Sequence, residues 1–219
     1  MSQLFDCSDA DQRETGIASA ISALKGGRLV VLPTDTVYGI GADAFDSEAV
    51  AALLAAKGRG RDMPVPVLVG SWHTIEGLVY NVPNSARELI RAFWPGALSL
   101  VVRQAPSLHW DLGDAHGTVM LRMPLHPVAI ELLRAVGPMA VSSANVSGRP
   151  PAVTAEAARE QLGEQVEVYL DAGTSEQQAA STIVDLTGAH PRVLREGPVR
   201  LEAIATVLGV EPTTLTGSD

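Results

Sequence analysis

Residues 28–44, RLVVLPTDTVYGIGADA, join an apolar run to a polar segment that contains glycines. The run RLVVLP reads as a buried strand, and hydroxyls and a carboxylate stand directly after it. The cations of AAKGRGRD, residues 55–62, follow shortly afterwards in the chain. Polar side chains at a strand end, with concentrated positive charge close by in sequence, predict a site for a phosphorylated, polar substrate.

Both parts of this prediction have a simpler alternative. The side chains of residues 34–36 could form an ordinary turn that bonds to nearby backbone groups. Lys57, Arg59 and Arg61 could be a solvated helix end that complements the helix dipole. As an anion clamp, alternate residues of an extended segment would put all three side chains on one side, towards triphosphate oxygens. A dinucleotide fingerprint is absent, because it would need glycine where the chain has Ala44.

The composition is that of a globular chain without a general affinity for polyanions. Of its 219 residues 46% are hydrophobic, enough for a substantial core, and the formal net charge is −9. This charge argues against a whole face that binds nucleic acid, although a local basic groove is compatible with it. The single cysteine, Cys7, excludes an internal disulfide and fits a reducing compartment. The acidic amino terminus, and the lack of an apolar run of about 20 residues, favour a cytoplasmic protein without membrane contact.

Helices and strands alternate along the chain without strict βαβ regularity. Apolar periodicity and capping residues predict helices at residues 9–25, 47–57, 71–80, 83–94, 126–136, 154–162 and 201–208. Short apolar runs predict strands at residues 28–33, 65–70, 97–102, 118–124, 138–143, 166–173, 181–188 and 191–197. This order predicts an α/β fold with a mixed sheet. We expect a single domain over residues 1–210 and a flexible tail over residues 211–219.

Two further polar features lie in or after predicted strands. Arg122 stands among apolar residues in TVMLRMP, so it needs either a structural carboxylate partner or an opening onto a ligand carboxylate. SSANVSG, residues 142–148, suits turn formation or polar substrate contacts, since no GxSxG elbow marks a nucleophilic serine. The five histidines have no metal-ligand spacing, so no protein metal site is predicted.

Six motifs in order, PTDTVYGIGADA, KGR, TVMLRMP, SSANVSG, STIVDL and VLREG, resemble those of the YrdC-like threonylcarbamoyl-AMP synthases. The resemblance spans residues 30–197. It implies a single YrdC-like domain whose twisted mixed parallel and antiparallel sheet, flanked by helices, surrounds a basic concave cavity. It also implies an enzyme that converts L-threonine, bicarbonate or carbon dioxide, and ATP into L-threonylcarbamoyladenylate and pyrophosphate. That product feeds the threonylcarbamoyl modification of the tRNA adenosine beside the anticodon.

The same resemblance implies roles for individual residues. Catalytic roles fall to Lys57, near the carbamate and the phosphates, and to Arg59, on the ATP phosphates. L-Threonine would be bound by Thr36, Arg122, Ser142 and Ser181. ATP would be bound by Arg59, Thr118, Ser143, Asn145 and Arg195. Mg²⁺ would accompany the triphosphate with few protein ligands.

Three positions depart from the family pattern. The family often has proline in place of Gly60, a polar or basic residue in place of Met63 and, in some members, histidine in place of Leu68. The alternative function is a non-catalytic RNA-binding module of the same fold, for which tRNA or tRNA-modification proteins would be partners. The low aromatic content, 4% of residues, counts against recognition by base stacking. A third reading is a carbamoyl-transfer domain like that of hydrogenase maturation proteins.

Overall fold

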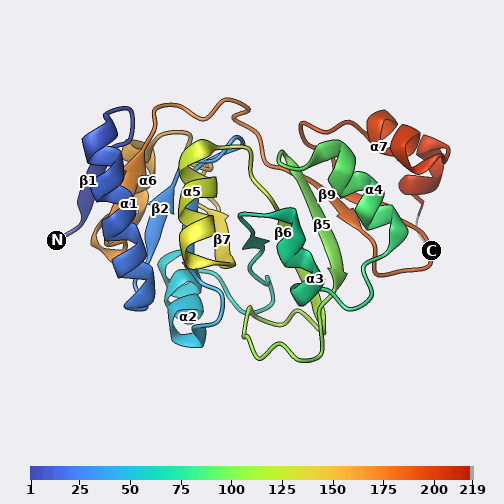
Figure 1. The fold of residues 1–219 in the computed structure, drawn as a ribbon, viewed down its shortest axis with the longest axis horizontal. Helices are drawn as coiled ribbons and strands as arrows, with labels where there is room; N and C mark the ends of the chain where they lie inside the picture. The colour runs from blue at the N-terminus through green and yellow to red at the C-terminus, as the bar shows by residue number, and fades with distance from the viewer. Residues whose placement is uncertain (218–219) are drawn as a thin grey trace.

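A ten-stranded sheet runs the length of the molecule (Figure 1). The computed structural model describes residues 1–217. The strands are β1 (Gln3–Asp6), β2 (Val30–Leu32), β3 (Gly39–Asp43), β4 (Val67–Leu68), β5 (Leu98–Arg103), β6 (Thr118–Arg122), β7 (Met139–Ser143), β8 (Val168–Asp171), β9 (Thr182–Asp185) and β10 (Arg192–Arg195). Their order across the sheet is β1-β8-β2-β3-β7-β4-β6-β5-β9-β10. Four neighbouring pairs are parallel and five are antiparallel, which confirms the predicted mixed α/β sheet.

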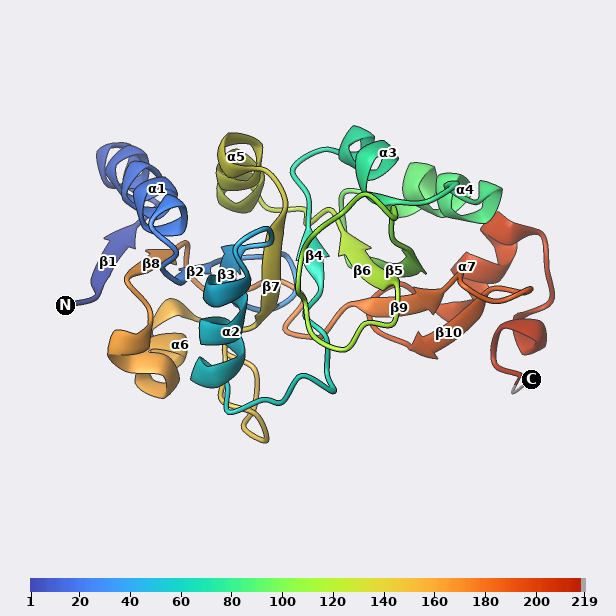
Figure 2. The same ribbon diagram turned by 90° about the horizontal axis from the view of Figure 1, so that it is seen from below.

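Helices cover both faces of this sheet. They are α1 (Ala10–Lys25), α2 (Ser47–Ala56), α3 (Ile75–Leu78), α4 (Asn84–Phe93), α5 (Pro127–Val136), α6 (Ala155–Leu162) and α7 (Leu201–Leu208), with 3₁₀ turns η1 (Trp72–Thr74), η2 (Gly163–Gln165) and η3 (Pro212–Leu215). Figure 2 shows α1, α5, α3 and α4 on one side of the sheet and α2 and α6 on the other. The predicted caps form at α1 and α2, where the side chains of Asp9 and Asp46 accept backbone N–H groups of the first turn.

Successive side chains of β2 belong to two different hydrophobic cores, one on each face of the sheet. Val30 and Leu32 belong to the core that contains the apolar faces of α1 and α5. Val31, between them, belongs to the larger core that contains α2 and α6. Because successive side chains of a strand point to opposite faces, one short apolar strand anchors both helix layers.

The strand β3 is not predicted by the sequence patterns, because its sequence, GIGAD, contains two glycines, which are depleted in strands. Its neighbour β7 explains the glycines. A Cβ on Gly39 would lie 2.6 Å from Val141 Cγ1, and one on Gly41 would lie 2.6 Å from Met139 Cε. The bare backbone of β3 therefore lets two large side chains of β7 pack across it. The patterns also miss β1, a short and largely exposed edge strand.

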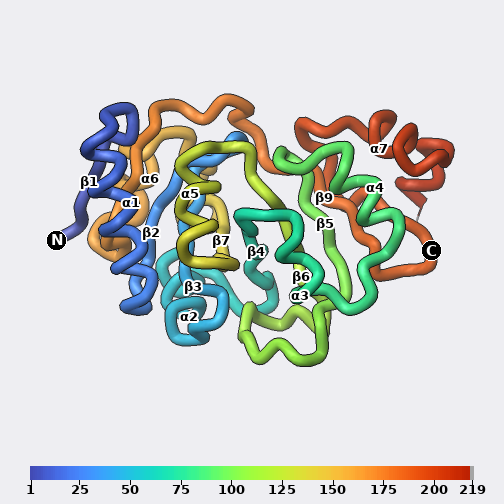
Figure 3. The backbone as a smooth tube through the Cα atoms, viewed as in Figure 1, coloured from blue at the N-terminus to red at the C-terminus, as the bar shows by residue number. Residues whose placement is uncertain are grey.

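The segment after β8 crosses the molecule to reach β9. These two strands are second and ninth in the sheet order, and Figure 3 shows the chain passing between them along the upper side. On the way, Ser175 N donates to Val153 O over 2.9 Å and Gln177 N donates to Asp35 O over 3.0 Å. These bonds fix the crossing segment against the turn that follows β2 and against the residues just before α6.

The carboxy-terminal segment differs from the expected flexible tail. Residues 212–215 form η3, and Leu215 is only 1% exposed because it packs into the larger core. Burial of this side chain holds the segment in place, while residues 218 and 219 lie outside the described part of the chain. The domain limit at residue 210 stays a prediction. None of the helices within residues 1–217 has the length and apolar character needed to span a bilayer.

Candidate active site

A cavity of about 290 Å³ brings together side chains that are far apart in the sequence. Its volume is close to the lower end of the range for ligand pockets, about 300 Å³. Seven residues that the family resemblance assigned to substrates line it: Thr36, Arg59, Arg122, Ser142, Ser143, Ser181 and Arg195. Three of them are arginines, and no aspartate or glutamate of the described residues is among those that line the cavity. Such a lining favours an anionic ligand.

Arg122, at the end of β6, is held by three partners. Its Nε donates to Gly96 O over 2.9 Å, its Nη1 to Thr36 Oγ1 over 2.7 Å and its Nη2 to Asp35 Oδ1 over 2.5 Å. A guanidinium carries five N–H donors, so one N–H remains on each terminal nitrogen. Two such donors match the two oxygens of a carboxylate. Both alternatives from the sequence are therefore compatible, since the ion pair exists and the guanidinium still faces the cavity.

Asp35 is the functional residue that sequence reasoning missed, since it was considered only as part of a turn. Its side chain is 4% exposed, and Oδ1 also accepts a hydrogen bond from Leu125 N over 2.9 Å. The carboxylate thus fixes the Arg122 guanidinium and the loop after β6 at once. The buried position of Arg122 signalled the need for a carboxylate, but nothing in the sequence selects one among 25 acidic residues.

Arg59 reaches the cavity from the segment after α2. Its Nη1 donates to Ser142 Oγ over 3.3 Å, whereas its Nε is buried without a partner among the described residues. A buried donor without a partner costs about 1–3 kcal/mol, and among the described residues Nη2 has no hydrogen-bond partner either, which leaves it available to a ligand. Burial lowers the pKa of Arg59, but a guanidinium stays protonated in proteins. Arg59 therefore presents a permanent positive charge beside Ser142.

Arg195 and Ser181 form another part of the wall. The Nε and Nη2 atoms of Arg195 donate to Ser181 O over 2.9 and 2.8 Å. The Ser181 hydroxyl lies 2.8 Å from that of Ser99. Gly197 packs against the backbone on either side of Ser181, where a Cβ would overlap the carbonyl oxygen of Ala180. These bonds leave Nη1 of Arg195 available to a ligand.

Lys57 and Asn145, both expected to contact substrates, are not among the residues that line the cavity. Lys57 is 2% exposed, and its Nζ donates to the backbone oxygens of Ser143 and Asn145 and to Asn145 Oδ1. The Asn145 amide donates in turn to two carbonyls of the same loop. Burial, together with the charge of Arg59, lowers the pKa of Lys57 to about 8. Both side chains therefore hold the loop of residues 143–149, which follows β7, and neither faces the cavity.

Thr118 lies beside the cavity rather than in it. It lines a second hollow of about 80 Å³, which shares Pro64 and Met120 with the main cavity. Its Oγ1 donates to Ala115 O over 2.7 Å. Thr118 can therefore touch only a ligand that extends past Met120.

The expected clamp of three cations is wrong, because Arg61 points elsewhere. Its Nη1 and Nη2 bind the Asp111 carboxylate over 2.9 and 2.8 Å, and Asp114 lies 3.4 Å from its Nε. The prediction assumed an extended segment, but Gly58 has φ of +60° and turns the chain after α2. Of the three cations, only Arg59 lines the cavity.

Of the three departures from the family pattern, only Leu68 lines the cavity. This side chain supplies apolar surface there. Met63 is 49% exposed and Gly60 lies in the segment after α2, and neither is among the lining residues.

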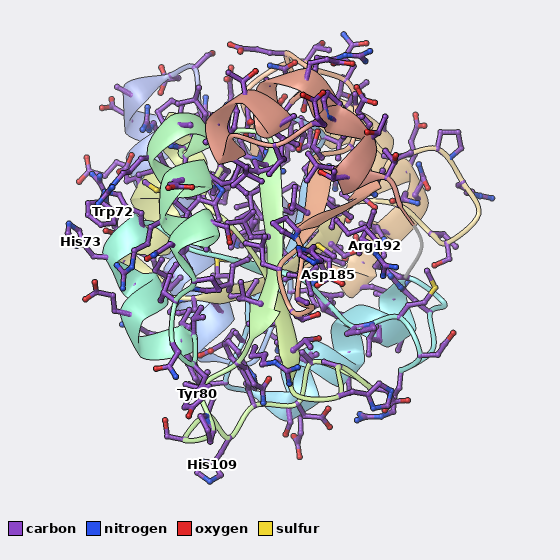
Figure 4. The ribbon with its side chains drawn as sticks, turned by 90° about the vertical axis from the view of Figure 1, so that its right-hand side faces the viewer. Trp72, His73, Tyr80, His109, Asp185 and Arg192 are labelled. Carbon is purple, nitrogen blue, oxygen red and sulfur yellow. The ribbon has the colours of Figure 1, made fainter. Side chains whose placement is uncertain are left out.

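The cavity does not fit a metal ion held by the protein. The described residues contain no group of three or more His, Cys, Asp or Glu side chains that could hold one. His109 lies at the edge of the molecule, away from its core, and His73 stacks on Trp72 at the surface (Figure 4). Magnesium is usually held by one or two carboxylates together with substrate phosphates. Hydroxyls and guanidinium groups line this cavity instead.

Comparisons with known proteins identify the family of this chain. A family model of Sua5, YciO and YrdC proteins, described as telomere recombination, matches residues 22–197. A Mycobacterium tuberculosis protein, named provisionally as a threonylcarbamoyl-AMP synthase, is 78% identical over 217 residues, which are 99% of this chain and 100% of that protein. A Pyrococcus abyssi threonylcarbamoyl-AMP synthase is 36% identical over 197 residues, 90% of this chain and 58% of that protein.

Solved structures give the same result. The crystal structure of P. abyssi Sua5 with L-threonine has a TM-score of 0.88 and 33% identity, covering 100% of this chain and 65% of that one. Escherichia coli YciO has a TM-score of 0.82 and 25% identity, covering 93% of this chain and 100% of that one. The chain thus spans less than two thirds of the P. abyssi relatives and the whole of the mycobacterial one. On the family match and these identities, the chain belongs to the Sua5/YciO/YrdC family.

Proposed function

We propose that this protein is an L-threonylcarbamoyladenylate synthase. It converts L-threonine, bicarbonate or carbon dioxide, and ATP into threonylcarbamoyl-AMP and pyrophosphate, the first step of threonylcarbamoyl modification of tRNA. The observation that carries the proposal is one cavity in which Arg59, Arg122 and Arg195 converge with threonine and serine hydroxyls. A carboxylate and a polyphosphate are the anions that such a set of donors binds.

L-Threonine would bind around Arg122. The two N–H groups left on its terminal nitrogens would hold the substrate carboxylate, as a guanidinium does in bidentate pairs. Thr36, Ser142 and Ser181 would supply hydroxyls to the amine and the side chain. The bonds that Arg122 donates to Gly96, Thr36 and Asp35 keep the guanidinium in place before the substrate arrives, so little order has to be gained on binding.

ATP would bind around Arg59 and Arg195. The Nη2 of Arg59 and the Nη1 of Arg195 take part in no hydrogen bond among the described residues, and phosphate oxygens would accept from them. Ser143 would add a hydroxyl. Thr118, in the adjoining hollow, and Asn145, in the loop behind Ser143, would border the nucleotide. Mg²⁺ would enter with the triphosphate and be held by its oxygens and by water.

The reaction requires positioning and charge stabilisation from the protein. The threonine amine forms an N–C bond to carbon dioxide and loses a proton, giving a carbamate. A carbamate oxygen then bonds to the α-phosphorus, and the bond from that phosphorus to the bridging oxygen breaks as pyrophosphate leaves. No protein atom forms a covalent bond in these steps. Arg59 and Arg195 would stabilise the charge that grows on pyrophosphate, while Arg122 orients the nucleophile.

Pyrophosphate release tests this function. The purified protein should release pyrophosphate from MgATP only when L-threonine and bicarbonate are present. Arg59→Ala should reduce the rate at least a hundredfold, in line with the loss of one preorganised donor to developing charge. Arg61→Ala, two residues away and bonded to surface aspartates, is the matched control and should keep the rate. Release that is indifferent to threonine would contradict the proposal.

Partners and location follow from the proposed reaction. tRNA and the proteins that consume threonylcarbamoyl-AMP would be the partners of a later step, and the cytoplasm, where ATP and tRNA occur, would be the location. The RNA-binding alternative predicts tight binding of tRNA that weakens steeply with salt and ignores threonine. A titration of the same tRNA preparation at two salt concentrations, with and without threonine, separates the two functions.

A further inference from the structure

Lys57 follows α2 directly and turns its side chain away from solvent. With an exposed fraction of 2%, it is among the largest fully buried side chains of the described residues. The ammonium donates to the backbone oxygen of Ser143, to that of Asn145 over 2.8 Å and to Asn145 Oδ1 at 3.4 Å. An ammonium has three donors, and this loop provides an acceptor for each of them.

A backbone bond strengthens the same connection. The Lys57 carbonyl accepts from Ser147 N over 2.9 Å. Both ends of this residue therefore bind residues 143–147, the loop that leaves β7. Ser142 and Ser143, at the end of β7, face the cavity, while Lys57 does not line it. The loop thus lies between the ammonium and the cavity.

Lys57 is followed within two residues by Arg59, whose Nη1 donates to Ser142 Oγ over 3.3 Å. Two side chains that follow α2 therefore bond to the end of β7: the Lys57 ammonium on the side away from the cavity, and the Arg59 guanidinium on the cavity side. A shift of the loop would move Ser142 and Ser143 and would break the bond between Ser142 and Arg59.

We infer that Lys57 is a positioning residue that acts through residues 142–145 and does not touch the substrates. The inference rests on the proposed function, and it revises the direct role expected from the sequence. Lysine suits the task because its compact ammonium reaches acceptors in three directions, whereas a planar guanidinium does not. The chain uses lysine at two of its sixteen lysine and arginine positions, Lys57 and the exposed Lys25.

The two roles make different predictions for threonine. If Lys57 touched the phosphates, its loss would weaken only the affinity for ATP. If Lys57 positions residues 142–145, its loss weakens the affinities for ATP and for threonine together, because Ser142 belongs to the proposed threonine site. Calorimetric titration of each ligand alone, on the full chain, measures the two affinities separately.

We expect Lys57→Met to raise the Kd of L-threonine and that of ATP by about tenfold each, the value of a hydrogen bond to a charged group. Lys25→Met, the matched control, should change neither. In a double-mutant cycle, adding Ser142→Ala to Lys57→Met should weaken threonine binding less than the two single effects combined. Circular dichroism first checks that each variant is folded, and Lys57→Gln replaces Lys57→Met if that variant is not.

A loss of ATP affinity with unchanged threonine affinity would overturn the inference in favour of direct phosphate contact. Unchanged affinity for both ligands would overturn it as well, as would unfolding of both Lys57 variants, since Lys57 would then serve the fold alone. Failure of the wild-type chain to bind threonine would instead contradict the proposed function, so the two failures are distinguishable.

Discussion

Asp35→Asn tests whether the buried ion pair with Arg122 supports the site. The two side chains are 4% and 8% exposed and 2.5 Å apart, and Asp35 Oδ1 also accepts the backbone N–H of Leu125. Asparagine keeps the volume and one acceptor oxygen but removes the negative charge. The Arg122 guanidinium would then be buried with hydrogen bonds and no counter-charge.

Removing one partner of a buried pair costs about 3–5 kcal/mol, because the remaining charge stays uncompensated. For a domain of this length, 1 kcal/mol corresponds to about 2–4 °C in Tm. We therefore expect the free energy of unfolding in denaturant to fall by about 3 kcal/mol and Tm by roughly 6–12 °C. A ligand carboxylate would restore the missing charge, so saturating L-threonine should stabilise the variant more than it stabilises the wild type.

Glu131→Gln provides the control. Glu131 pairs with Arg13 over 2.5 Å, but the two side chains are 48% and 31% exposed. Exposed pairs contribute about 0–1 kcal/mol, so this variant should unfold almost as the wild type does. If Asp35→Asn costs no more than Glu131→Gln, the reasoning about the buried pair is refuted.

Three further outcomes are expected. Gly39→Ala should lower the free energy of unfolding by about 1–3 kcal/mol, because the new methyl group overlaps Val141, whose β-branched side chain is stiff. Gly77→Ala, which meets open space, should not lower it, and chemical denaturation measures both. Burial raises the pKa of Cys7 to about 11, so iodoacetamide at pH 8 should alkylate the unfolded chain and spare the folded one, as mass spectrometry would show. Burial lowers the pKa of Lys57 from 10.5 to about 8, so between these two pH values the unfolded chain holds a proton that the folded chain has lost. The free energy of unfolding of the wild type, minus that of Lys57→Met, should therefore rise by about 3 kcal/mol from pH 8 to 10.5. A difference that does not change with pH would contradict this.

The sequence could predict those site residues whose position follows from a strand end. Thr36 follows β2, Arg122 ends β6, and Ser142 and Ser143 end β7, so the polar side chains after apolar runs meet in one cavity. The mixed sheet followed from the same runs. Apolar periodicity reports which stretches are buried, and this information is local.

The features that could not be predicted depend on contacts between distant segments. The choice of Asp35 as the partner of Arg122 is set by the packing of the turn after β2 against β6. The direction of Arg61 depends on the turn at Gly58 and on the loop that carries Asp111. In β3, local strand propensity was overridden by the bulky neighbours of β7.

The crossing from β8 to β9 has a consequence for biogenesis. The cavity needs Thr36 near the amino terminus and Arg195 near the carboxyl terminus, and it is complete only after the crossing segment and β10 have docked. Pairings of such long sequence separation form slowly, because loop closure comes before the contacts that reward it. During synthesis, the cavity therefore becomes complete only after the residues up to Arg195 have left the ribosome, and a nascent chain halted before β10 would expose an unfinished sheet edge to chaperones.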